Sequence, residues 1–477
     1  MDKIIKESFI YKIIISISNW LSKICSNSLL VNIFLSENKE KREKIYKNSI
    51  ISKIFDTVLS FFRKLAKKIK LDKLLENSIF VKPIIWVTLV VALTPFLPTM
   101  AVLLLVLLSL GTLFLKAITQ EDFEFKYSNM NIWILLFVLV YLFSAVTSIS
   151  MSESRNIFML ITAFILFYFA LINSVDTKSK MKMLIYVFII SATCASIYGI
   201  YQYHFSDVYS QAWIDETKFE DIRMRAYSTF ENPNVFGEYL IMVIPIIAAL
   251  IFEEKGFMKK LGLFWLFAIN CLALIYTFSR GCWLGIILAI AILAIMIDRR
   301  FILLGVIALL ISPFVLPDTI INRFMSIGDM TDSSTSYRVY IWFGTIAMLK
   351  DYWLSGVGLG ITSFNRVYPI YSYSGIVAPH SHNLYLQLMA EHGIAGLIVF
   401  VGIIYNFYKE TAIAISKKKN LVLAGIISGM AGFLLEGMFD YTWYNYRVIL
   451  IFWTVIALGY AESEICKKEE WKEMYYD

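Results

Sequence analysis

Hydrophobic residues in this chain gather into long runs separated by short polar connections. A helix needs about 20 mainly apolar residues to cross the hydrocarbon core of a bilayer. The runs predict twelve candidate spans: residues 82–97, 99–117, 131–150, 156–174, 184–204, 235–252, 261–279, 281–297, 301–317, 392–408, 421–439 and 448–462. Only Leu97-Pro98-Thr99 separates the first two. The pattern therefore predicts an all-α polytopic membrane protein with about twelve transmembrane helices.

Residues 1–80 follow a different pattern. Apolar residues recur there at helical spacing, at Ile51, Ile54, Phe55, Val58, Phe62, Leu65 and Ile69, while lysines and arginine fill other positions. This spacing predicts a basic amphipathic helix on the cytoplasmic leaflet, as part of an N-terminal region that anchors or stabilises the protein. An earlier apolar segment, Phe9 to Leu21, is too short and interrupted to predict a span.

Two long polar connections divide the remaining chain into regions. The first part of the bundle covers 81–317 and contains an outer loop at about 205–234. A large extracytoplasmic loop at 318–391 follows, with a short amphipathic helix expected at Ile341 to Leu349. Aromatic residues in this loop could anchor it at the interface or stack on sugars. The second part of the bundle covers 392–462, and 463–477 form a cytoplasmic tail.

Composition supports the membrane assignment. Hydrophobic residues make up 58% of the 477 residues and charged residues 17%, and the mean hydropathy is +0.66. These values exclude a soluble enzyme. The five cysteines are scattered and form no Cys-x-x-Cys pair, so neither a disulfide framework nor a zinc site is expected.

Lysine and arginine set the expected orientation of the bundle. Lysine-rich connections, such as those around Lys178, Lys259 and Lys417, fall on one side, which the positive-inside rule makes cytoplasmic, together with both termini. Eight of the twelve arginines then lie on the outer side: Arg155, Arg223, Arg225, Arg280, Arg323, Arg338, Arg366 and Arg447. Arginine is always charged, and its planar fork fits phosphate oxygens. Any single arginine could instead face water or lipid headgroups.

Four polar clusters on the outer side are candidates for chemistry. They are Arg223 to Asn234, which includes Arg225, Glu231 and Asn234; Ser279-Arg280-Gly281; Ser336-Tyr337-Arg338; and His380-Ser381-His382-Asn383. Arg280 stands between two hydrophobic segments with almost no loop around it. A charge there is costly, which favours a function, although the side chain could also snorkel to the interface.

The histidines suggest what the arginines could act with. Arginines could hold a diphosphate as a leaving group, and a neutral histidine could accept a proton from an incoming hydroxyl. His382 could be this base or only a hydrogen-bonded loop histidine, and His380 could support it or have no role. Asn383 could merely cap the following helix. The outer loops contain no Asp-x-Asp motif, so the sequence predicts neither a metal nor a cofactor.

The spacing His382-Asn383-x9-Gly393-x-x-Gly396 resembles the signature of the O-antigen ligase and polysaccharide polymerase family of bacterial membrane proteins. Thr229 to Asn234 and Ser279 to Trp283 also resemble blocks of that family, and the similarity covers roughly residues 80–460. The resemblance implies a helical bundle with a large outer loop, similar to lipid-dependent glycosyltransferases. It also implies a location in the bacterial cytoplasmic membrane with an extracytoplasmic active site.

The activity that the resemblance implies is glycan transfer from an undecaprenyl-diphosphate donor to a hydroxyl of a glycan, lipid or wall acceptor. By motif, His382 would be the catalytic histidine, and Arg225, Arg280 and Arg338 would contact the diphosphate. Glu231, Asp440 or Glu391 could orient the histidine. The expected partners are the lipid-linked donor, the acceptor and membrane lipids, without nucleic acid. The residues do not distinguish a ligase from a polymerase.

Two other functions fit parts of the pattern. A transporter or flippase for lipid-linked glycans would suit twelve spans, but it should place ionisable residues deep within several of them. Here Glu238, Glu436 and Asp440 lie only near span ends. A non-catalytic assembly partner of a glycan machine is the other alternative, and it predicts that single substitutions at His382 or Arg280 leave activity intact.

Overall fold

The computed structural model describes residues 49–75, 78–126, 128–206, 222 and 224–476. The chain divides into two units between Thr57 and Val58. In the first unit, the described residues include the beginning of α5 (Ile50–Lys68), the helix that the basic amphipathic spacing predicts. The segment from Phe9 to Leu21, Arg223 and most of the first outer loop lie outside the described residues.

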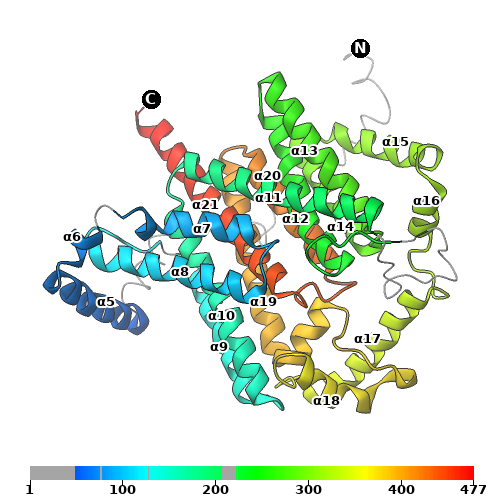
Figure 1. Ribbon diagram of the computed structural model, residues 1–477, viewed down its shortest axis with the longest axis horizontal. Helices are drawn as coiled ribbons and strands as arrows, with labels where there is room; N and C mark the ends of the chain where they lie inside the picture. The colour runs from blue at the N-terminus through cyan, green and yellow to red at the C-terminus, as the bar shows by residue number, and fades with distance from the viewer. Residues whose placement is uncertain (1–48, 76–77, 127, 207–221, 223, 477) are drawn as a thin grey trace, which may run out of the picture. The chain divides into compact units, whose positions relative to one another are not determined.

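All regular elements in the described part of the second unit are helical (Figure 1). Within the described residues, eight helices are long and apolar enough to cross a membrane: α8 (Thr99–Thr119), α10 (Met151–Ser174), α11 (Lys178–Phe205), α12 (Pro233–Glu253), α13 (Phe257–Tyr276), α14 (Arg280–Ile297), α19 (Leu384–Lys417) and α21 (Tyr446–Tyr476), the last through its first 23 residues. Four shorter apolar helices accompany them: α7 (Pro83–Leu93), α9 (Met130–Val146), α15 (Arg300–Val315) and α20 (Leu421–Glu436). The chain is an all-α polytopic membrane protein.

The helices depart from the predicted spans at identifiable residues. Helix α7 ends at Leu93, four residues before the predicted limit, where a turn containing Pro95 leads into α8. The predicted span 392–408 lies inside α19, which runs from Leu384, where Asn383 caps it, to Lys417. A break at Gly393 interrupts α19, and Ile394 N donates to the Trp353 carbonyl there.

The large connection between α15 and α19 is also helical. It contains α16 (Asp318–Met325), α17 (Ser333–Tyr352), α18 (Ile361–Tyr371) and the 3-10 turn η3 (Tyr373–Gly375). The helix expected at 341–349 is present, but α17 extends beyond it at both ends. Helix α17 begins earlier because the Asp332 carboxylate accepts from the backbone N–H groups of Ser334 and Thr335.

Glycines let three helices approach closely at the centre of the bundle. Side chains at Gly425 or Gly429 of α20 would meet the backbone of α12, and one at Gly432 would meet the Gly285 carbonyl of α14. Such small-residue contacts are typical of helix packing in membranes. Nearly all of α12 is buried, and it lies beside α14 and α20 (Figure 1).

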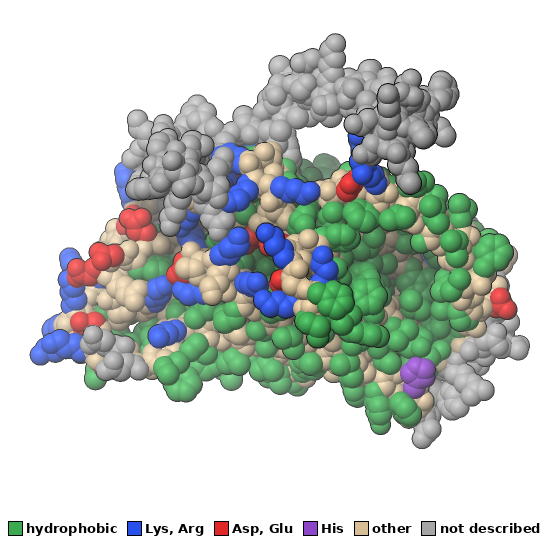
Figure 2. Space-filling model, turned by 90° about the horizontal axis from the view of Figure 1, so that it is seen from above, with side chains coloured by type: hydrophobic (Ala, Val, Ile, Leu, Met, Phe, Trp, Pro, Cys, Tyr) green, Lys and Arg blue, Asp and Glu red, His purple; other side chains and the backbone are tan. Residues whose placement is uncertain are grey.

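The surface is rich in exposed apolar side chains, as expected for contact with lipid. Figure 2 shows hydrophobic side chains over a large part of one face. Exposed examples are Trp265 of α13 and Leu310 and Phe314 of α15. No residue of α15 is buried. A soluble protein rarely exposes so large an apolar surface, whereas lipid tails solvate it.

Candidate functional site

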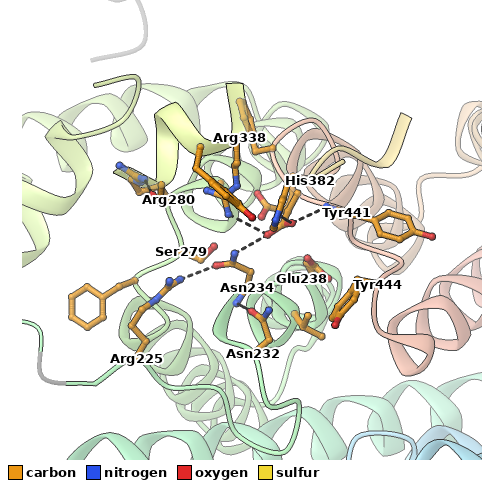
Figure 3. A pocket seen from close by; sticks show the side chains of 18 of the residues that line it. Arg225, Asn232, Asn234, Glu238, Ser279, Arg280, Arg338, His382, Tyr441 and Tyr444 are labelled. Carbon is orange, nitrogen blue, oxygen red and sulfur yellow. Dashed lines mark hydrogen bonds and ion pairs between the residues drawn. The ribbon is translucent and has the colours of Figure 1, made fainter. Parts of the chain in front are cut away.

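A polar cavity of about 480 Å³ lies at one end of the bundle, where α20 ends and α12, α14, α17 and α19 begin. Figure 3 shows the side chains that line it. Its lining includes the following polar residues: Arg225, Asn232, Asn234, Glu238, Ser279, Arg280, Arg323, Ser333, Ser334, Tyr337, Arg338, His380, His382, Glu436, Asp440, Tyr441 and Tyr444. Four arginines and a histidine pair thus share one cavity. Some of these residues, such as Arg225 and Asp440, are more than 200 positions apart in the sequence.

Helix ends add to the positive potential of this cavity. Asn232 caps α12, Arg280 begins α14, Ser333 begins α17, and Asn383 caps α19 one residue after His382. The first N–H groups of a helix have no partner within the helix, and its dipole favours negative charge at this end. Together with the arginines, these ends suit an anionic ligand.

The loop before α19 holds His382 in an unusual backbone conformation. His382 has φ +47°, and its N–H donates to Nδ1 of His380 at 3.2 Å. Trp342 Nε1 donates to the His382 carbonyl at 3.1 Å. Residues other than glycine rarely adopt this left-handed backbone conformation. The two hydrogen bonds therefore help to hold His382 in it.

Asp440 fixes the imidazole of His382. Nδ1 of His382 lies 2.9 Å from Oδ1 of Asp440. Burial would raise the pKa of Asp440, but the charges of His382 and Arg338 and the hydrogen bond from His382 hold this pKa well below its usual value. The carboxylate is therefore ionised and accepts from Nδ1, which leaves Nε2 as the nitrogen available to a ligand.

A chain of polar side chains extends from Asp440 to Arg225. Asn234 Nδ2 donates to Oδ2 of Asp440 at 2.7 Å, and Arg338 Nη2 lies 3.2 Å from the same oxygen. Arg225 Nη2 donates to Oδ1 of Asn234 at 2.7 Å, and Figure 3 shows Asn234 between Arg225 and His382. Burial, followed by the charges of Arg323 and Arg338, lowers the pKa of Arg225. Burial is the main cause of this lowered pKa, and the neighbouring guanidinium charges add to it.

Arg280 lies in a separate group of contacts across the cavity. Its Nη2 forms an ion pair with Oδ1 of Asp332 at 2.8 Å, and its Nη1 donates to the Ser326 carbonyl at 3.0 Å. Arg323 Nη1 lies 3.7 Å from the other oxygen of Asp332. Burial would raise the pKa of Asp332, but the hydrogen bonds from Arg280 and Ser334 and the arginine charges lower it. Asp332 therefore holds two arginines at the cavity wall.

A second network supports the histidine loop from within α19. Ser381 N donates to Oε1 of Gln387 at 2.8 Å, and Gln387 Nε2 donates to Oε1 of Glu391 at 3.0 Å. The Tyr441 hydroxyl donates to the same Glu391 oxygen at 3.4 Å, and Tyr441 N donates to Oδ1 of Asp440 at 2.8 Å. These bonds join the residues on both sides of the His382–Asp440 contact. Glu391 thus contacts this supporting network, while Asp440 contacts the histidine itself.

The structure brings most of the predicted site residues together. Arg225, Arg280, Arg338, His382, His380, Asn234 and Asp440 all line the cavity. Asn383 lies behind it as the cap of α19. Glu231 is exposed and does not belong to the lining, so it does not contact His382 there. Burial lowers the pKa of His380 to about 3, and this imidazole is neutral near pH 7.

Several cavity residues were missed or underused by sequence reasoning. Arg323 appeared among the outer arginines but carried no motif that marked it. Glu238 and Glu436 were interpreted only as span-end charges, yet both line the cavity and are buried. Asp332 was not singled out, although the run Asp332-Ser333-Ser334 is typical of a helix start.

Two groups of cavity residues have the donor atoms of a metal site. One contains His380, His382 and Asp440, and the other Glu238, Glu436 and Asp440. Both share Asp440, whose two oxygens already accept hydrogen bonds from His382, Tyr441 and Asn234 and face Arg338. Neither oxygen is left for a cation without loss of those contacts.

The bundle and its cavity define a polytopic membrane protein with a cationic, histidine-containing site. Residues 264–401 match the family described as O-antigen ligase. This segment includes Arg280, Arg338, His382, Gly393 and Gly396. No curated protein sequence matches the chain. This segment is therefore similar to the O-antigen ligase family, and the similarity supports a glycan-transferring role.

Proposed function

We propose that this protein is an inverting, metal-independent glycosyltransferase that moves or polymerises a glycan from an undecaprenyl-diphosphate donor onto an acceptor hydroxyl. The observation that carries the proposal is the His382–Asp440 contact of 2.9 Å inside a cavity bordered by four arginines. A base and an anion site within one cavity are the two parts that such a transfer requires.

The arginines would bind the donor diphosphate. Nε of Arg338 is buried and has no hydrogen-bond partner among the described residues, so this donor is available to a ligand. Arg225 and Arg280 line the same cavity, as does Arg323. Binding by several guanidinium groups and by helix ends would stabilise the charge that develops on the leaving diphosphate.

His382 would activate the acceptor. Its Nε2 would take the proton of the acceptor hydroxyl as that oxygen forms a bond to the anomeric carbon of the donor sugar. The bond from this carbon to the diphosphate oxygen breaks at the same time, and its electron pair leaves with the lipid diphosphate. Asp440 would stabilise the imidazolium, which later releases its proton to water. One direct displacement inverts the anomeric centre.

The proposed location is the bacterial cytoplasmic membrane, with the cavity on the extracytoplasmic side and both termini in the cytoplasm. Lysines support this orientation because Lys178, Lys259 and Lys260 lie at helix ends opposite to the cavity. A donor whose lipid tail lies in the outer leaflet could then reach the cavity with its diphosphate at the level of the helix ends.

The test is a reconstituted transfer reaction. Purified protein in lipid vesicles is given defined lipid-linked repeat units, and the products are separated by size. A ladder of products identifies a polymerase, whereas a single addition to a second acceptor identifies a ligase. Absence of any transferred glycan with donor and acceptor of several sugar compositions would contradict the proposed activity.

A further inference from the structure

Two buried carboxyl groups in the cavity have no assigned role. Glu238 of α12 and Glu436 of α20 are 1% and 2% exposed, and both line the cavity. Oε2 of each has no hydrogen-bond partner among the described residues. A ligand oxygen of each lies within 4.8 Å of one on the other and on Asp440. Three buried acidic groups therefore meet at one point of the cavity.

Of these three carboxyl groups, only that of Asp440 forms ion pairs with neighbouring side chains in the described part of the chain. Asp440 is paired with His382 and Arg338. The titratable groups near Glu238 are Asp440, Glu436 and Cys282. Those near Glu436 are Asp440, Glu238, Cys282, Arg338 and Arg225. Glu238 and Glu436 form no ion pair with these arginines, although burying an unpaired carboxylate is very costly. The two groups must therefore hold protons or a cation.

Protons fit this environment better than a cation. Both oxygens of Asp440 already accept hydrogen bonds, which leaves only two carboxyl groups as ligands. The four arginines that line the cavity would also repel a divalent ion. Two neighbouring carboxyl groups that are both buried commonly keep a proton instead of ionising together.

The position of Glu436 indicates a role for a proton on its carboxyl group. Its carboxyl group packs against Gly281, where any side chain would collide with it. Gly281 is the second residue of α14 and follows Arg280, so this carboxyl group lies at a helix end suited to an anion. An ionised carboxylate there would compete with a phosphate for that place, whereas a protonated one can donate to a phosphate oxygen.

We propose that Glu238 and Glu436 stay protonated and donate hydrogen bonds to the diphosphate of the lipid-linked donor, so that donor binding requires protons on this pair. This inference rests on the proposed function. Loss of the protons would place negative charge against the ligand and weaken binding.

The test measures binding to the full-length protein in lipid nanodiscs from about pH 6 to about pH 9. The probe is a short-chain prenyl diphosphate linked to N-acetylglucosamine, a diester whose own charge is constant over this range. Because histidine can also gain a proton near neutral pH, every protein carries His382→Gln. Affinity should fall by roughly tenfold per pH unit once the pair ionises.

The Glu238→Gln, Glu436→Gln double variant should bind with the low-pH affinity of its parent at every pH, because the amide is neutral and still donates. Glu231→Gln, at an exposed position outside the cavity, should keep the pH dependence of the parent. The two single variants provide a check if the double variant folds poorly.

The outcomes separate this inference from the proposed function. Affinity of the parent that does not change with pH, or the same fall in the double variant, overturns the role of the pair. Binding that needs added Mg²⁺ and is lost in the double variant also overturns it, in favour of a cation site. Absence of binding at every pH contradicts the diphosphate site itself, and the role of the pair fails with it.

Discussion

Nδ1 of His382 lies 2.9 Å from Oδ1 of Asp440, although 58 residues separate them in the sequence. The loop before α19 supplies the histidine, and the turn between α20 and α21 supplies the carboxylate. The contact fixes which imidazole nitrogen is occupied and which one is available. Asp440 also holds Asn234 and Arg338, so one carboxylate joins the proposed base to the proposed diphosphate site.

Replacing Asp440 with asparagine tests this contact. Asparagine is close in size but cannot stabilise the imidazolium, so Asp440→Asn should lower the rate of transfer by about 100-fold or more. Asp351→Asn is the matched control, because Asp351 is exposed and lies outside the cavity lining. Rates are measured with the reconstituted donor and acceptor. A rate for Asp440→Asn within a few-fold of the control would argue against the role of Asp440.

Arg338→Lys tests the diphosphate site separately. Lysine keeps the charge but loses the planar fork, including the unpartnered Nε donor of Arg338. Donor affinity should weaken by about tenfold or more, in line with the loss of a hydrogen bond to a charged group. Arg366→Lys is the control, since Arg366 is exposed and donates to the Ile149 carbonyl. Equal donor affinity in both variants would contradict this assignment.

How far the sequence predicted the site depends on the kind of signal. The two histidines, Arg225, Arg280 and Arg338 stand in short motifs near helix ends, and helix ends on one side of a bundle meet in space. Glu391 and Glu231 were equal candidates to Asp440 as partners of His382, because three-dimensional distance is not visible in sequence spacing. The carboxyl pair was missed because Glu238 and Glu436 come from two helices far apart in the sequence, and only the packing of α12 against α20 brings them together.

The fold was predicted more fully than its boundaries. Hydropathy located the apolar helices of residues 83–468, because each run of lipid-soluble residues is continuous. Helix ends followed local chemistry that hydropathy does not register: the cap at Asn383 moved the start of α19 eight residues earlier, and the cap at Asp332 lengthened α17. The four helices that are shorter than a full span are likewise defined by turns and not by apolar content.

His380 should make the protein sensitive to acid. Burial lowers the pKa of His380 to about 3, whereas a histidine in an unfolded chain has a pKa of about 6.5. Between these values the unfolded chain binds a proton that the folded protein does not, so stability falls as the pH drops through this window. His380→Asn should reduce the fall of the thermal unfolding midpoint between about pH 7 and about pH 5. His204→Asn, at the exposed end of α11, should not.

Gly393→Ala should destabilise the protein. Gly393 has φ +66° and ψ −168°, a conformation essentially restricted to glycine, and a side chain there would collide with the Leu354 carbonyl. The free energy of unfolding should fall by more than about 1–3 kcal/mol. Gly305→Ala in α15, where a methyl group meets open space, should be neutral or slightly stabilising. Thermal unfolding of both variants in one detergent measures the difference, and equal midpoints would show that the break in α19 is unimportant.

The most direct test of the account is single-turnover transfer by His382→Gln in the reconstituted system. The arginines and Asp440 remain, so the variant should bind the donor with nearly normal affinity. Without a base, the transfer step should slow by about 100-fold to 10,000-fold. Transfer at the wild-type rate by a folded His382→Gln protein would contradict the assignment of His382 as the base and with it the proposed mechanism of transfer.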